Sequence, residues 1–299
     1  MNGPLSPRLG VSAWVVLLVL CFACPLARGN DARFTQADYD RRAAELLPRL
    51  PGPGFTVVVE PPFVVAGDEP PEVVRRHCRQ TIRWAVDRLR RAYFSQDPAE
   101  IIEIWLFRDK ASYEKHCGAL FGQAPASPYG FYSASDRALA MNIATGGGTL
   151  VHEIVHAFMA TNFPDCPAWF NEGLGSLYEQ SADREGAIVG LTNWRLAGLQ
   201  RAIRDNRLCS FERLCTMGDR EFYRDAQGTN YAQARYLCYY LQERGLLQTF
   251  YRRFLANRDK DPGGCRTLQE VLQDSDLDRF QRVWEAWVLE LTFPEGVRP

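Results

Sequence analysis

The sequence predicts an α+β fold, in which a small mixed sheet is followed by a mainly helical half. Before residue 144, short apolar and β-branched runs of strand length alternate with a few helical patterns. The glycines Gly146, Gly147 and Gly148 end this region, and after them apolar residues recur at helical spacing almost to the C-terminus. Strands first and helices afterwards are typical of α+β proteins, and the pattern favours one compact unit.

The elements before Gly146 follow from local signals. The run Pro51-Gly52-Pro53-Gly54 separates a first helix from two short strands. Pro71 is placed to begin a long amphipathic helix, since proline suits the first helical turn. In order, we expect a helix over 35–47, strands over 56–60 and 63–66, a helix from Pro71 to about Tyr93, a strand over 101–107, a helix over 110–120, and strands over 130–134 and 138–143.

Composition limits the functions that need consideration. The 299 residues are 46% hydrophobic and 24% charged, which supplies a large core and excludes a disordered, collagen-like or polytopic membrane protein. Arginine supplies nearly all of the basic residues, but acidic residues lie beside them and the net charge is only −1. We therefore expect no nucleic-acid partner.

Residues 1–29 have the pattern of a signal peptide. Arg8 precedes an apolar run, Pro25 breaks this run, and Ala27 and Gly29 place small residues before a cleavage site at Asn30. We expect export to the periplasm, the cell surface or outside the cell, with no stable membrane span after cleavage; an uncleaved N-terminal anchor is the alternative. Seven of the nine cysteines would remain, an odd number that leaves at least one of them free or intermolecular.

The residues His152, Glu153 and His156 form an HExxH pattern among apolar neighbours. On a helix, residues four apart lie about 40° from each other, so both imidazoles point from one face toward one place. Zinc favours such nitrogen ligands. Glu153 lies beside them, where a carboxylate can take a proton from a metal-activated water.

A catalytic zinc site needs a third protein ligand and one open position. Fifteen residues separate His156 from Glu172, and the prolines between them would end one helix and begin the next. Glu172 would then lie in the first turn of a helix packed antiparallel to the HExxH helix, with Gly173 and Gly175 allowing close approach. The predicted zinc ligands are His152, His156 and Glu172.

Two helical histidines can also be an ordinary surface pair. The chain has only four histidines, however, and two of them occur here in an apolar helix, where burial without a partner would be costly. This favours the metal site. His77 and His116 stand alone among charged neighbours, and we interpret them as surface residues.

The run Trp169-Phe170-Asn171-Glu172-Gly173 after the HExxH pattern resembles the gluzincin zinc metallopeptidases. The match continues into Tyr178 and Glu179 and is most similar to the peptidase MA-like domains of secreted bacterial proteins. This resemblance implies a zincin-type helical half, with an N-terminal α/β extension over 30–100 and a peptidase MA-like domain over 101–299. It also implies that His152, His156 and Glu172 bind zinc and that Glu153 is the general base.

Two positions depart from these relatives. The strand over 138–143 has no glutamate of the kind that binds the free amine of the substrate in zinc aminopeptidases, so we expect internal cleavage. Thermolysin-like relatives place an aspartate four residues after the glutamate ligand to orient a histidine. In this chain that position is Ser176.

The expected function is therefore secreted, zinc-dependent hydrolysis of peptide bonds by an endopeptidase, with Zn²⁺ as cofactor, a zinc-activated water and Glu153 as the base. Gluzincins place a tyrosine from a later helix over the metal, so the resemblance makes Tyr231 the candidate oxyanion donor. Core packing is the alternative role for this tyrosine. Two other functions stay open: a zinc-containing binding or structural domain without turnover, and a zinc amidase that acts on cell-wall peptides.

Overall fold

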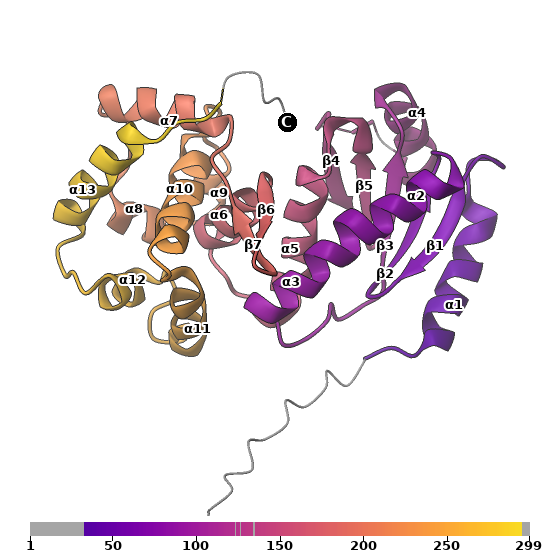
Figure 1. Cartoon of the computed structure of the whole chain (residues 1–299), viewed down its shortest axis with the longest axis horizontal. Helices are drawn as coiled ribbons and strands as arrows, with labels where there is room; N and C mark the ends of the chain where they lie inside the picture. Colours follow the sequence, from indigo (N-terminus) through magenta and orange to yellow (C-terminus); the bar gives the residue numbers. More distant parts are fainter. Residues whose placement is uncertain (1–32, 123, 126, 134, 295–299) are drawn as a thin grey trace, which may run out of the picture. The chain divides into compact units, whose positions relative to one another are not determined.

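The computed structural model describes residues 33–294 except 123, 126 and 134, and these residues belong to one compact unit. The α+β prediction is confirmed, because a five-stranded mixed sheet is followed by a mainly helical half (Figure 1). The predicted signal peptide, residues 1–29, lies outside the described residues. Among the residues described, no helix is long and apolar enough to cross a membrane.

The sheet has the strand order β1-β2-β3-β5-β4. Strands β2, β3 and β5 pair in parallel at the centre, while β1 and β4 pair antiparallel at the two edges. Every residue of the three central strands is buried, because both faces of the sheet are covered. The predicted strands are confirmed to within a residue at each end: β1 (Thr56–Glu60), β2 (Phe63–Gly67), β3 (Ile102–Phe107), β4 (Gly130–Ser133) and β5 (Ala138–Asn142).

Helices cover both faces of the sheet, because neighbouring residues on a strand point to opposite faces. Val64 and Ala66 of β2 share one core with α1 (Gln36–Leu46) and α4 (Lys110–Phe121). Phe63 and Val65 share the other core with the helix predicted from Pro71 and with α5 (Gly148–Asn162). The helix from Pro71 is confirmed, although its middle segment is π-helical: α2 (Pro71–His77), η2 (Cys78–Arg83) and α3 (Trp84–Ala92).

The predicted boundary at residue 100 falls inside this sheet. Strand β2 lies before it and β3 after it, yet the two strands pair directly, from Phe63 opposite Ile102 to Gly67 opposite Leu106. The N-terminal extension expected over 30–100 therefore builds one sheet with the rest of the chain.

The second half consists of helices, as predicted, with one exception. The exception is an antiparallel hairpin of β6 (Ser181–Arg184) and β7 (Ala187–Gly190), whose turn residues Glu185 and Gly186 both have positive φ. Strands of four residues are too short to show an alternating pattern. The helices of this half are α6 (Ala168–Leu177), α7 (Arg195–Arg204), α8 (Phe211–Thr216), α9 (Asp219–Phe222), α10 (Thr229–Glu243), α11 (Leu247–Asn257), α12 (Cys265–Leu272) and α13 (Leu277–Glu290), with the short 3₁₀ turns η1 (Leu47–Arg49) and η3 (Ile143–Thr145) in the first half.

The cysteines contribute packing to this fold. All seven in the described part of the chain are free thiols. Cys238 is fully buried, as predicted, and a β-carbon at Gly173 of α6 would lie 3.0 Å from its sulfur. Cys238 thus fills the space where α10 meets α6.

Candidate metal centre

Helix α5 carries both histidines, and a glycine lets it begin in a crowded place. A side chain at Gly148 would collide with the backbone carbonyl of Glu179, so only glycine fits at this first residue of the helix. His152 and His156 lie one turn apart on α5, with His152 buried and His156 half-buried. Their Nε2 atoms are 2.8 Å apart, so both rings meet at one place.

The third residue of the cluster comes from α6, which begins at Ala168 directly after Pro167. The predicted break between the two helices is therefore confirmed. Glu172 lies in the second turn of α6 and not in the first turn as predicted, because the helix already begins at Ala168. Oε2 of Glu172 is 3.2 Å from Nε2 of His152 and 3.5 Å from Nε2 of His156.

The two glycines after Glu172 allow close packing of α6, as predicted, but on different sides of the helix. Gly175 faces α5, where a β-carbon would lie 3.2 Å from two ring atoms of His152. Gly173 faces α10, where a β-carbon would lie 3.0 Å from the carbonyl oxygen of Ala234. The two glycines thus fix α6 between α5 and α10.

The three donor atoms are spaced as ligands of one metal ion would be. Zinc that is bound tetrahedrally at about 2.0–2.1 Å holds neighbouring ligand atoms about 3.3 Å apart. The observed separations of 2.8, 3.2 and 3.5 Å are close to this value. His152, His156 and Glu172 are thus a group of side chains that can hold a metal ion.

Contacts at the far nitrogen of each histidine determine which atom faces the cluster. Nδ1 of His156 lies 3.0 Å from Oδ1 of Asn171, and Nδ1 of His152 lies 3.3 Å from Oε1 of Glu179. The contact of His152 with Glu179 is an ion-pair distance without hydrogen-bond geometry. Because both partners are acceptors, each ring, once it has lost its second proton, keeps the remaining one on Nδ1 and presents the lone pair of Nε2 to the cluster. Oε2 of Glu172 is buried and accepts no hydrogen bond from the described residues. Three lone pairs that converge in this way fit a bound cation.

The carboxylate behind His152 is Glu179, whereas position 176 is a serine. Arg195 holds it with Nη2 2.8 Å from Oε1 and with Nε 3.1 Å from Oε2, and Nδ2 of Asn193 lies 3.3 Å from Oε2. A carboxylate behind a ligating histidine fixes the ring and its tautomer. Glu179 lies seven residues after Glu172 and not four, so the position considered in the sequence, Ser176, did not lead to this role.

The two carboxylates also determine the charge of the cluster. Burial lowers the pKa of His152, but Glu172 and Glu179 outweigh burial and raise this pKa to about 10. Burial opposes the ionisation of Glu179, yet His152 and Arg195 lower its pKa to about 2. Burial likewise opposes the ionisation of Glu172, and the two histidines lower its pKa well below its usual range. The site therefore favours a positive charge between two ionised carboxylates.

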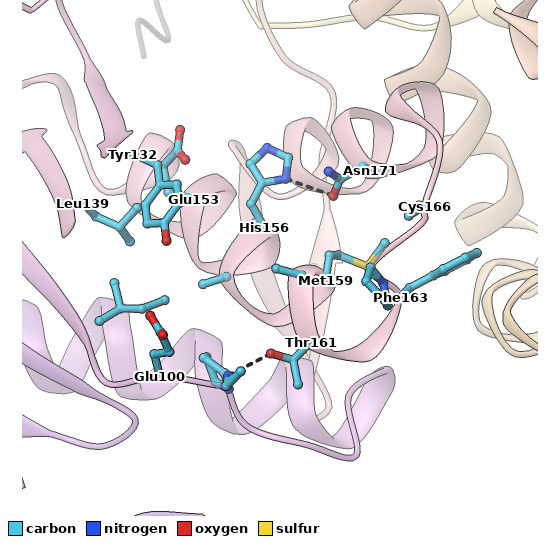
Figure 2. A pocket seen from close by; sticks show the side chains of 16 residues that line it. Glu100, Tyr132, Leu139, Glu153, His156, Met159, Thr161, Phe163, Cys166 and Asn171 are labelled. Atoms are coloured by element: carbon cyan, nitrogen blue, oxygen red, sulfur yellow. Dashed lines mark hydrogen bonds between the residues drawn. The ribbon is translucent and has the colours of Figure 1, made fainter. Parts of the chain in front are cut away.

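Glu153 does not belong to this three-residue cluster. It is half-buried and lines a pocket of about 400 Å³ that also reaches His156 and Asn171. Figure 2 shows Glu153 and His156 projecting from the same helix on one side of this pocket. The other walls come from β4, β5, the start of β3 with the segment before it, and the loop after α5. The apolar lining includes Ala157, Met159 and Ala160 of α5, together with Ile102, Leu139 and Phe163.

One tyrosine of the helical half contacts the cluster, and a second lies beside the first. The hydroxyl of Tyr223, the residue after α9, donates a hydrogen bond of 2.8 Å to Oε1 of Glu172. Tyr231 lies in the first turn of α10, as predicted, with its ring centroid 6.2 Å from that of Tyr223. Burial and the negative charge of Glu172 raise the pKa of Tyr231. The sequence does not identify Tyr223 as a residue of the site, because no recognisable helical pattern precedes it.

The other two histidines lie outside the cluster. Nε2 of His77 is 2.9 Å from Oε2 of Glu69. His116 is stacked on Phe107 with ring centroids 5.9 Å apart, and it meets the edge of Phe55. Both histidines are half-buried, so each lies only partly at the surface, and His116 also packs against two aromatic rings.

A family model described as "Protein of unknown function (DUF1570)" matches residues 144–261. This range includes α5, α6, Glu179, Arg195 and Tyr231 but covers less than half of the chain. No curated protein matches the chain. The matched range thus coincides with the cluster, and the chemistry of the cluster is inferred from its geometry.

Proposed function

We propose that this chain is an exported, zinc-dependent endopeptidase. The supporting observation is the convergence of lone pairs from His152, His156 and Glu172 beside Glu153 in an open pocket. These three residues would hold Zn²⁺, and a bound zinc ion acts as a Lewis acid that lowers the pKa of water and polarises a carbonyl group. Export is supported by the sequence of residues 1–29.

The remaining steps are assigned to side chains of this protein. Glu153 takes a proton from the attacking water and returns it to the leaving amine. Tyr231 donates a hydrogen bond to the carbonyl oxygen as negative charge develops there. Tyr223 holds Oε1 of Glu172, so that Oε2 faces the two histidines.

The surroundings of Glu153 support a peptide as the substrate. Strand β4 lies at the edge of the sheet, so its outer backbone groups are available to pair with an extended peptide. Tyr132 of β4 lines the pocket and is 46% exposed, which leaves it free to contact such a peptide. The apolar pocket next to His156 is suited to one of the side chains of the peptide. The strand β5 has none of the glutamates that would bind a free amine, which supports internal cleavage.

The test compares the wild-type protein with Glu153→Gln on a peptide library, each protein being loaded with one equivalent of zinc. Glu153→Gln keeps the size and polarity of the side chain and removes the base. Zinc content should therefore stay unchanged while hydrolysis falls by about 10²-fold or more. Glu114→Gln is the matched control, because Glu114 lies on α4 with a side-chain exposure of 55%, and this variant should cleave at the wild-type rate.

Each outcome bears on a different part of the proposal. Cleavage by Glu153→Gln at the wild-type rate would show that Glu153 is not the base. A wild-type protein that binds zinc and cleaves no peptide would contradict the endopeptidase function. Hydrolysis of peptidoglycan fragments in a parallel assay would then identify an amidase.

A further inference from the structure

Arg195, the first residue of α7, contacts two parts of the site that come from distant positions in the chain. Its guanidinium binds both oxygens of Glu179, with Nη2 2.8 Å from Oε1 and Nε 3.1 Å from Oε2. Its Cζ atom lies over the ring of Tyr231, 5.5 Å from the ring centroid. One side chain therefore touches both the carboxylate behind His152 and the candidate oxyanion donor.

The position of Arg195 is itself fixed by neighbouring hydrogen bonds. Its backbone N–H donates to Oδ1 of Asn193 at 3.1 Å, and the backbone N–H of Asn193 donates to the hydroxyl of Tyr236 at 3.0 Å. Asn193 is fully buried, and its side-chain amide lies 3.3 Å from Oε2 of Glu179. The start of α7 is thus anchored both to α10 and to Glu179.

We propose that Arg195 is a positioning residue that couples His152 to Tyr231. On one side, Arg195 holds the carboxylate of Glu179 at 3.3 Å from Nδ1 of His152. On the other side, it fixes the ring of Tyr231 through a cation–π contact. The inference rests on the proposed function, because it assumes that His152 binds a metal.

The contacts of Arg195 require an arginine. A planar guanidinium binds a carboxylate through two parallel hydrogen bonds while its face lies on an aromatic ring. The ammonium group of lysine is a point charge that cannot reproduce this fork geometry. Arg195→Lys therefore keeps the charge and loses the geometry, whereas Arg195→Gln loses both.

The first measurement uses zinc alone and needs no substrate. Loss of the carboxylate behind a ligating histidine costs about 10- to 100-fold in metal affinity. Arg195→Gln keeps this carboxylate, Glu179, but no longer holds it in place, so we expect the zinc Kd to rise by about 10-fold in a chelator competition. Arg195→Gln also changes the visible absorption spectrum of Co²⁺ bound in place of zinc, because the ring of His152 is no longer held in its wild-type orientation. Arg195→Lys gives an intermediate Kd.

Arg88→Gln is the matched control for this measurement. Arg88 binds Asp183 through two nitrogens, and its Cζ atom lies 4.9 Å from the centroid of the Trp84 ring. The control variant thus loses the same kinds of contact at a place outside the cluster. It keeps the wild-type zinc Kd and the wild-type Co²⁺ spectrum.

The second measurement concerns Tyr231 and compares kcat at saturating zinc for Arg195→Gln, Tyr231→Phe and the double variant. If Arg195 acts through Tyr231, the kcat of the double variant falls by a smaller factor than the product of the factors for the two single variants. Glu179→Gln removes the charge behind His152 but keeps the Arg195 side chain, whose Cζ atom lies over the ring of Tyr231. It therefore weakens zinc binding but lowers kcat less than Arg195→Gln does.

The results separate the two sides of the inference from each other. A wild-type zinc Kd in Arg195→Gln overturns the role toward His152, and strictly multiplicative reductions of kcat overturn the role toward Tyr231. If the wild-type protein binds zinc and cleaves no peptide, the proposed function fails. The zinc measurement still decides whether Arg195 positions His152.

Discussion

Replacing Gly175 by alanine should weaken metal binding without weakening the fold. A β-carbon at this position would lie 3.2 Å from Cδ2 and Nε2 of His152 and 3.3 Å from Cε1. Ordinary contacts between carbon atoms are about 3.5–4.0 Å, so the ring would have to move by about 0.3 Å. Ligand distances in metal sites fall within about 0.2 Å of their usual values, so a shift of this size moves His152 away from a good ligand position. We therefore expect a zinc Kd on the order of 10-fold higher in Gly175→Ala.

The effect of Gly175→Ala on stability should differ from its effect on the metal. An alanine inside a helix is about 0.5–1 kcal/mol more favourable than a glycine. In the metal-free protein this gain in stability offsets the strain that the new methyl group causes at His152. Gly198 of α7 supplies the matched control, because a β-carbon there meets nothing within 4 Å. Gly198→Ala should raise the free energy of unfolding by about 0.5–1 kcal/mol and leave the zinc Kd unchanged. Urea denaturation and chelator competition measure the two quantities, and a wild-type zinc Kd in Gly175→Ala would refute the packing argument.

Four further outcomes concern the surroundings of the cluster. Tyr231→Phe removes only a hydroxyl and should lower kcat by roughly 10- to 10³-fold with zinc retained; an unchanged kcat would remove Tyr231 from the site. Tyr223→Phe loses the hydrogen bond to Glu172 and should instead raise the zinc Kd by about 10-fold in a chelator competition, and an unchanged Kd would contradict the orienting role. Zinc must displace a proton from His152, whose pKa of about 10 keeps it protonated at neutral pH. The zinc affinity should therefore rise by about 10-fold per pH unit below that pKa, and an affinity that does not change with pH would contradict this. Ala157→Phe fills the pocket and should lower kcat/KM for large apolar side chains relative to alanine by about 10-fold; an unchanged ratio would show that the pocket does not bind the substrate.

Local geometry made the elements and the three clustered side chains predictable. Thr35 caps α1 through a capping box with Asp38, and Pro167 immediately precedes α6, so both helix starts are visible in the sequence. The spacing of His152 and His156 sets their common direction on any helix. Glu172 could be predicted as well, because a turn between the two helices is enough to bring it to both histidines.

The surrounding side chains could not be predicted, because tertiary structure determines which of them approach. Glu179 returns to His152 because α6 ends at Leu177 and the chain turns at Tyr178. Arg195 meets Glu179 after the intervening hairpin of β6 and β7, which carries no recognisable pattern. Tyr223 follows a helix of four residues, which is too short to show helical spacing. Each of these contacts depends on how separate elements pack against one another.

The zinc content of the purified protein tests the central claim most directly. After incubation with zinc and removal of loosely bound metal, the wild-type protein should hold about one zinc ion per chain, as three protein ligands imply. Elemental analysis of His156→Ala and Glu172→Ala, each of which lacks one donor of the cluster, should show that most of the zinc is lost, while Glu114→Gln should keep it. Full retention of zinc in both ligand variants would contradict the assignment of the metal centre.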